Sequence, residues 1–133
     1  MPGPFSFEYA VLRVMPRVER GECINAGVIV YCKALEFLSA RIALDPSKLR
    51  ALDATADVAL IQSHLDALAR VCEGGPDAGP IGLLSQAERF RWLVAPRSTM
   101  IQPSAVHEGL CDDPHTAMER VLAQLGLAGR GMA

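Results

Sequence analysis

The chain has 133 residues and 50% of them are hydrophobic, so it can bury a core as one domain and is too apolar to be disordered as a whole. Its formal net charge of −2 argues against a protein dedicated to nucleic acid, because such proteins usually carry a basic face. No apolar run approaches the roughly 20 residues that span a bilayer, and the first residues do not form a secretory signal. We therefore expect a cytoplasmic protein with a single domain at 1–133, an ordered core at about 7–125 and a frayed tail at 127–133.

Three strands are predicted in the first third of the chain, at 7–15, 23–32 and 36–44. The polar segment between the first two contains a glycine and predicts a hairpin loop. Gly27 lies inside the nearly apolar second strand, which indicates a bulge or a close approach of another backbone. Because the strands follow one another with short connections, we expect an antiparallel meander.

Two helices are predicted next. Asp45 and Pro46 fit the cap and the first position of a short helix. A second helix begins near Asp53 or Thr55 and ends at 74–75, where two glycines follow one another. One face of this helix is apolar because hydrophobic residues recur at spacings of three and four. They are Val58, Ile61, Leu65, Leu68 and Cys72.

The remaining chain predicts a mixed segment followed by a helix. Residues 85–88 fit a capping box that opens a short helix, although the alternation of aromatic and basic residues at 89–94 also suits a strand. Residues 97–102 suit a short strand, 104–111 a connection, and 114–125 a helix that Gly126 ends. The fold class that follows is α+β, with a small antiparallel sheet (the meander plus a later strand) and helices packed on one face.

The sequence contains no recognisable catalytic or cofactor motif. There is no phosphate-binding loop, no dinucleotide fingerprint and no Cys-x-x-Cys pair, so no cofactor is identified. The pattern favours a protein without catalytic activity and leaves an enzyme as the alternative. His107, Glu108, Cys111 and His115 are metal-capable groups close in sequence. We assign no metal site to them, because the acidic pair at 112–113 is already explained as the cap of the following helix.

One set of residues is a candidate for binding an anion. Arg20, Glu22 and Asn25 stand at the entrance of the second strand, and Arg13 lies on the strand before it. With Arg97 from the second half, these arginines could hold a phosphate or carboxylate in a bidentate manner. The competing interpretation is structural: Arg20 and Glu22 bracket a turn, and Asn25 satisfies backbone groups at a bulge.

A second basic set invites a nucleic-acid interpretation. Arg89, Arg91 and Arg97 are interleaved with Phe90 and Trp92, a pattern that can bind a single strand by stacking and phosphate contact. The alternative is an amphipathic segment with its aromatic residues in the core and its arginines in water. We favour the alternative, because only two aromatic residues contribute and the chain is acidic.

Two stretches carry a family resemblance. The first is Tyr9-x-x-x-Arg13-x-x-Pro16-x-x-x-Arg20-Gly21-Glu22-x-x-Asn25-x-Gly27-Val28. The second is Arg89-Phe90-x-Trp92-Leu93-x-Ala95-Pro96-Arg97-Ser98-Thr99, with Cys111-Asp112-Asp113-Pro114 after it. Together they resemble a family of small bacterial proteins known as domain of unknown function 3037. The resemblance implies a stand-alone bacterial domain and transfers no activity and no catalytic residue.

The functional prediction is a small accessory or protein-interaction domain without catalytic activity. Its expected partner is another protein or a second copy of itself, because a small sheet has edges that a dimer can cover. The alternatives are an anion- or nucleotide-binding domain or enzyme built on Arg13, Arg20, Glu22, Asn25 and Arg97, and a weak binder of single-stranded nucleic acid. No membrane partner is expected.

Overall fold

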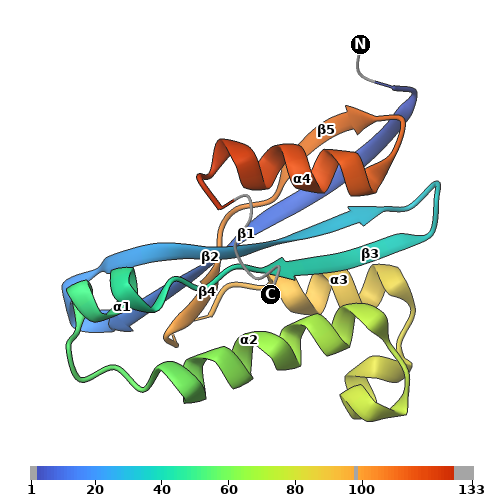
Figure 1. Cartoon of the computed structure of the whole chain (residues 1–133). Helices are drawn as coiled ribbons and strands as arrows, with labels where there is room; N and C mark the ends of the chain where they lie inside the picture. Colours follow the sequence, from blue (N-terminus) through green and yellow to red (C-terminus); the bar gives the residue numbers. More distant parts are fainter. Residues whose placement is uncertain (1–2, 98, 128–133) are drawn as a thin grey trace.

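An antiparallel sheet of five strands forms the centre of the molecule (Figure 1). The structure, a computed structural model, describes residues 3–97 and 99–127. The predicted meander is confirmed: β1 (Phe5–Arg17), β2 (Glu22–Cys32) and β3 (Phe37–Ile42) pair in sequence order. The turn between β1 and β2 contains a short 3-10 helix, Val18–Arg20, and a left-handed glycine, as the hairpin prediction requires.

Two short strands share the other edge of β1. β5 (His107–Cys111) pairs with residues 5–9 of β1, and β4 (Ile101–Pro103) pairs with residues 12–14. The predicted strand at 97–102 is thus found in part as β4. The expected connection at 104–111 is wrong, because it contains β5. A five-residue segment with one glycine and no β-branched residue has little strand propensity of its own, and its long-range pairing with β1 decides its conformation.

Four α-helices surround the sheet, each opened by a polar cap. They are α1 (Pro46–Leu52), α2 (Val58–Glu73), α3 (Gln86–Val94) and α4 (Pro114–Gln124), capped by Asp45, Asp57, Ser85 and Asp113. Residues 89–94 are helical because Ser85 and Glu88 form the complete capping box. α2 starts later than predicted, since the Asp53 carboxylate accepts hydrogen bonds from Thr55 in a local turn instead of capping the helix.

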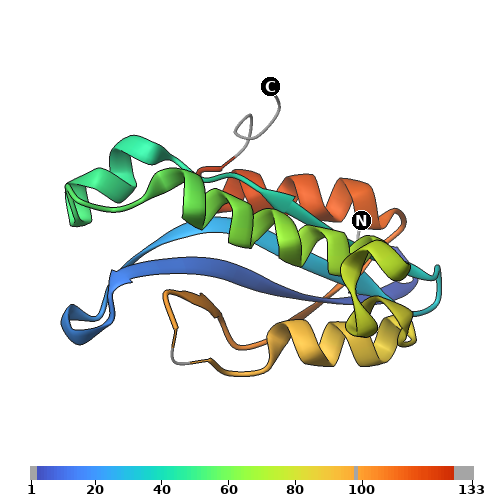
Figure 2. The same ribbon diagram turned by 90° about the horizontal axis from the view of Figure 1, so that it is seen from below.

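The α+β class is confirmed, but the expected packing of all helices on one face needs correction. One core joins Leu12 and Val14 of β1 to α2 and α3, which lie side by side beneath the sheet (Figure 2). The opposite core joins Phe7 of β1 and Val30 of β2 to α4. Both faces are covered because β1 and β2 are apolar on both, so helices on a single face would leave the other exposed to water.

The end of α4 is closed by a hydrogen-bonding pattern that continues into the chain beyond it. The Gly126 amide donates to the Ala123 carbonyl, and the Leu127 amide donates to the Leu122 carbonyl. This is a Schellman motif, which brings a hydrophobic residue back onto the helix. Leu127, the first residue of the segment expected to fray, is accordingly only 2% exposed. Residues 128–133 of that segment lie outside the described residues.

Within the described ranges, no helix has both the length and the apolar composition needed to cross a membrane.

Candidate functional site

Three polar side chains stand in one line across the sheet. Arg13 of β1 is paired with Asn25 of β2 on one side and with Gln102 of β4 on the other. Residues directly opposite each other in antiparallel strands project to the same face, so the three side chains are neighbours. We call Asn25, Arg13 and Gln102 the polar row.

A β-bulge in β2 creates this alignment. Leu12 pairs with Gly27 and Arg13 pairs with Asn25, so Ala26 is an extra residue without its own partner on β1. In a regular ladder Arg13 would stand opposite Ala26, and Asn25 would point to the other face. The bulge therefore places Asn25 beside Arg13, and re-aiming a side chain is a common role of bulges. The prediction of a bulge or a close approach at Gly27 is confirmed, because the Gly27 backbone also lies against the backbone of Arg41.

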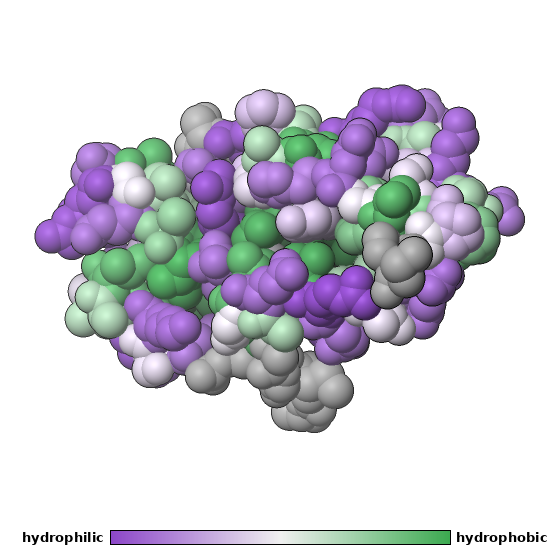
Figure 3. Space-filling view, turned by 90° about the horizontal axis from the view of Figure 1, so that it is seen from above, coloured by the Kyte–Doolittle hydropathy of each residue, from purple (hydrophilic) through white to green (hydrophobic). Residues whose placement is uncertain are grey.

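The polar row projects from the α4 side of the sheet. Leu12 and Val14, on either side of Arg13, belong to the core on the α2 and α3 side, so alternation places Arg13 on the other face. Figure 1 shows α4 over the half of the sheet that contains β5, while no described helix lies above the half where β4 pairs with β1. Figure 3 views this face, on which hydrophilic residues are interspersed with hydrophobic ones.

Arg13 and Asn25 leave most of their hydrogen-bonding capacity unused within the described chain, whereas Gln102 does not. Arg13 donates one long hydrogen bond of 3.4 Å, from Nη2 to the Pro103 carbonyl, and no carboxylate among residues 3–97 and 99–127 forms an ion pair with it. The Asn25 side chain bonds to no described residue. Gln102 donates from Nε2 to the Thr99 carbonyl over 2.9 Å and to the Met15 Sδ over 3.8 Å. All three side chains are half-buried.

The chemistry of the polar row suits binding. A guanidinium presents five donors in a planar fork that matches the two oxygens of a carboxylate or phosphate. The Asn25 carboxamide on one side can add donors to the same anion, whereas Gln102 Nε2 on the other side already donates to Thr99 and Met15. The row itself holds no carboxylate, imidazole or thiol, so what its three side chains offer chemically is hydrogen bonding and the charge of Arg13.

The other three predicted site residues lie elsewhere. Arg20 and Glu22 form an exposed ion pair of 3.8 Å at the tip of the β1–β2 hairpin, as the structural interpretation expected. Arg97 donates from Nη1 to the Leu93 carbonyl and from Nη2 to the Trp92 carbonyl at the end of α3. Its guanidinium also stacks on the Trp92 ring at 4.8 Å, and partial burial lowers the pKa of Arg97. The structure therefore brings together Arg13 and Asn25 but does not join Arg20, Glu22 or Arg97 to them by any hydrogen bond among described residues.

The basic set considered for nucleic acid is largely committed to the fold. Arg89 is 8% exposed and its guanidinium donates to the carbonyls of Val71, Cys72 and Leu84. Arg97 holds the end of α3 in the same way. Only Arg91 of this set is exposed without a backbone partner in the described chain. A single free arginine does not provide the several phosphate contacts on which nucleic-acid binding depends.

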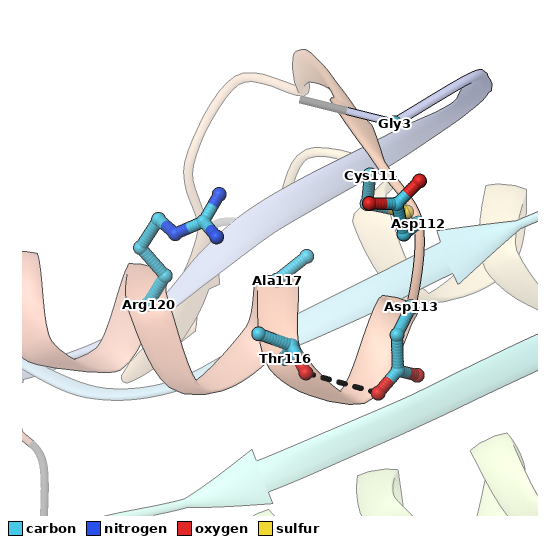
Figure 4. A pocket seen from close by; sticks show the side chains of 7 residues that line it. All are labelled: Gly3, Cys111, Asp112, Asp113, Thr116, Ala117 and Arg120. Atoms are coloured by element: carbon cyan, nitrogen blue, oxygen red, sulfur yellow. Dashed lines mark hydrogen bonds between the residues drawn. The ribbon is translucent and has the colours of Figure 1, made fainter. Parts of the chain in front are cut away.

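A pocket of about 200 Å³ lies at the start of α4 (Figure 4). Asp112 and Arg120 present opposite charges to it, while the Asp113 carboxylate accepts from the Thr116 hydroxyl and the His115 amide. These hydrogen bonds hold the pKa of Asp113 below its usual value. Burial raises the pKa of the Cys111 thiol, which keeps it protonated and a poor metal ligand.

The metal-capable groups near this pocket are dispersed. His107 stacks on Tyr9 at 5.2 Å, whereas His115 meets the edge of Phe37 at 4.8 Å. No group of three or more histidine, cysteine, aspartate or glutamate side chains with metal-binding geometry occurs in the described part of the chain.

Comparison with known proteins identifies the family. A family model described as "Protein of unknown function (DUF3037)" matches residues 9–125, which include most of the sheet and all four helices. The chain belongs to this family. No curated protein and no solved structure matches the chain significantly. The polar row lies entirely within the matched residues, so it is part of the domain that this DUF3037 member shares with its family model.

Proposed function

We propose that this DUF3037 protein is a non-catalytic binding domain that holds a carboxylate of an acidic partner protein at the polar row. The observation that carries the proposal is Arg13, a half-buried cation that pairs with no carboxylate among the described residues and stands between two carboxamides. Burying a charge without a counter-charge is costly, so an acidic group supplied from outside would stabilise this arrangement.

The shape of the polar row favours a protein partner. Neighbouring strands are about 4.8 Å apart, so the row spans roughly 10 Å across three strands of an open sheet face. Such a face suits an extended segment that lies across the strands, whereas small ligands usually occupy enclosed pockets. As part of the same proposal we place the protein in the bacterial cytoplasm, where its four free cysteines would stay reduced.

The chain provides a reporter beside the polar row. Cys23 lies two residues before Asn25 on β2, so it shares the same face, and it is the exposed one among the four cysteines. A small environment-sensitive fluorophore attached to Cys23 can be titrated with a synthetic peptide of alternating glutamate and alanine. We expect a saturable change in fluorescence, and we expect Arg13→Gln to weaken binding about tenfold or more, because a charge-assisted bidentate contact is lost.

Arg91→Gln is the matched control, because it removes the same charge from an exposed position on α3, beneath the other face. It should bind the peptide as the unsubstituted protein does. Equal affinity of Arg13→Gln and the unsubstituted protein would contradict the proposal. Equal weakening by Arg91→Gln would also contradict it, since the attraction would then follow net charge and not the polar row.

A second candidate is self-association through β5. β5 pairs with β1 and with no other described strand, and three of its five residues are exposed, including Leu110 at 50%. Val106, just before it, is 38% exposed. The opposite edge differs, since no residue of β3 is exposed and its Arg41 forms an ion pair with Glu119 of α4. An open edge strand is a template for pairing, and Leu110 gives this edge an exposed apolar side chain.

Light scattering coupled to size-exclusion chromatography tests this candidate. We expect a dimer at about 100 μM that Leu110→Glu converts to a monomer, because a charge on the paired edge must be desolvated. Leu83→Glu is the control, because Leu83 is 71% exposed in the loop before α3, and it should leave the dimer intact. If the unsubstituted protein is a monomer at this concentration, self-association through β5 is contradicted.

A further inference from the structure

A second pocket lies between the β2–β3 turn and the start of α3. Its volume is about 500 Å³, and it is lined by Tyr31, Lys33 and Glu36 on one side and by Ser85, Gln86 and Ala87 on the other. The Gln86 side-chain amide donates to the Glu36 carbonyl over 2.9 Å, which fixes the turn against the helix. Figure 1 shows α3 beginning beneath this turn. None of these residues belongs to the polar row.

Tyr31 is the unusual residue of this pocket. It is only 7% exposed and its ring packs on Phe90 with a centroid separation of 5.0 Å, yet its hydroxyl forms no hydrogen bond to a described residue. Every fully buried side-chain oxygen or nitrogen in the described chain has a partner. The Tyr31 hydroxyl must therefore reach the surface, and the pocket is the surface that Tyr31 lines. A phenylalanine would fill the core equally well, so packing does not account for the hydroxyl.

The start of α3 lines the same pocket. The Ser85 hydroxyl accepts from the Glu88 amide, and the Glu88 carboxylate accepts from the Ser85 amide, so the capping box uses these two groups. The amides of Gln86 and Ala87 belong to the first turn, whose N–H groups have no partner within the helix. They carry the positive end of the helix dipole, and the Lys33 ammonium adds a full charge at the rim.

We propose that this pocket binds the phosphate group of a small ligand, a site separate from the polar row. A tetrahedral oxyanion can accept hydrogen bonds from the Tyr31 hydroxyl and the two α3 amides at once, while Lys33 neutralises its charge. Glu36 also lines the pocket, and its carboxylate opposes the anion. The proposal therefore makes two opposite predictions: removing the Tyr31 hydroxyl weakens binding, and removing the Glu36 charge strengthens it.

Amide NMR during a titration with inorganic phosphate tests this site, with O-phosphoserine as a second arm and sodium chloride at matched ionic strength as the control. We expect the amide resonances of Gln86 and Ala87 to move with phosphate and not with chloride. Tyr31→Phe should weaken binding about fivefold and leave the melting temperature nearly unchanged, because the hydroxyl makes no internal hydrogen bond. Glu36→Gln should tighten binding by a similar factor.

The two arms of the titration distinguish a phosphorylated small ligand from free phosphate. Tighter binding of O-phosphoserine than of inorganic phosphate would support a phosphorylated ligand, and the reverse order would support free phosphate. Immobile Gln86 and Ala87 resonances, or identical titrations of Tyr31→Phe and the unsubstituted protein, would overturn the proposal. Because the polar row contributes no residue, failure here leaves the proposed function untouched, and loss of peptide binding in Arg13→Gln leaves this site untouched.

Discussion

Replacing Arg89 by methionine is expected to lower the free energy of unfolding by about 3 kcal/mol, because a buried guanidinium that bonds three carbonyls is lost. Nε donates to the Leu84 carbonyl over 3.1 Å, and Nη1 donates to the Val71 and Cys72 carbonyls over 2.9 and 2.7 Å. Val71 and Cys72 lie in the last turn of α2, whose carbonyls have no partner within the helix. Arg89 thus ties the end of α2 to the loop before α3.

Methionine keeps an unbranched apolar stem and part of its packing, so the loss reports mainly the hydrogen bonds of the guanidinium. Urea unfolding followed by circular dichroism measures it. Arg91→Met is the control, because Arg91 is exposed on the same helix, and its effect should stay within about 0.5 kcal/mol. A loss below about 1 kcal/mol for Arg89→Met would mean that water replaces the guanidinium and that Arg89 does not hold the helices together.

Replacing Gly27 by alanine is expected to cost about 2 kcal/mol and to disturb the polar row. A Cβ on Gly27 would lie 2.5 Å from the Arg41 carbonyl oxygen and 3.3 Å from the Ile42 Cα. These are backbone atoms of β3, so relief requires β2 and β3 to separate, and overpacking of this kind typically costs about 1–3 kcal/mol. The smaller entropy of the unfolded alanine chain offsets only part of this cost.

Gly109→Ala is the matched control within the same sheet. Its Cβ would meet the ring of the buried Phe7 at 2.8 Å, and relief there needs a shift of one side chain and not the separation of two strands, so we expect a smaller loss of stability than for Gly27→Ala. Because Gly27 follows the bulged Ala26, the Gly27→Ala protein should also bind the glutamate–alanine peptide more weakly. Full stability and full binding in this variant would contradict the close approach of β2 and β3.

Local signals in the sequence predicted most of the elements. Asp45 with Pro46 and Ser85 with Glu88 mark helix starts by side-chain hydrogen bonds that involve only neighbouring residues, and the structure contains those bonds. The alternation at 89–94 was ambiguous because Phe90 and Leu93 fit one helix face while Phe90 and Trp92 fit one strand face. The capping box decides between them, since it supplies the hydrogen bonds that a helix start requires.

The candidate site was only half predictable. Arg13 and Asn25 lie in one hairpin, and a bulge beside Gly27 was expected, so their approach follows from local pattern. Gln102 is 89 residues from Arg13 along the chain, and it joins the row only because β4 pairs with β1. No local signal fixes that register. The sequence grouped Arg97 with the strand-entrance residues, but it gave no sign that the Arg97 guanidinium would donate to the Leu93 and Trp92 carbonyls.

The sequence contains a signal that helices cover both faces of the sheet. Charged residues in the expected first strand are limited to Glu8 and Arg13, and the second is almost wholly apolar. A strand that is apolar on both faces requires two layers of cover. The last helix, whose apolar face includes Met118 and Leu122, supplies the second layer. Arg13 therefore stands out as a cation on a mostly apolar strand, which is the feature that the proposed function explains.

The most direct test observes the polar row itself while the glutamate–alanine peptide binds. NMR can follow the Arg13 Nε–H resonance together with the side-chain amide resonances of Asn25 and Gln102. The account predicts that all three move during the titration with one common dissociation constant. If the peptide binds while these resonances stay fixed and those of the hairpin-tip Arg20 move, the anion is held elsewhere and the central claim is contradicted.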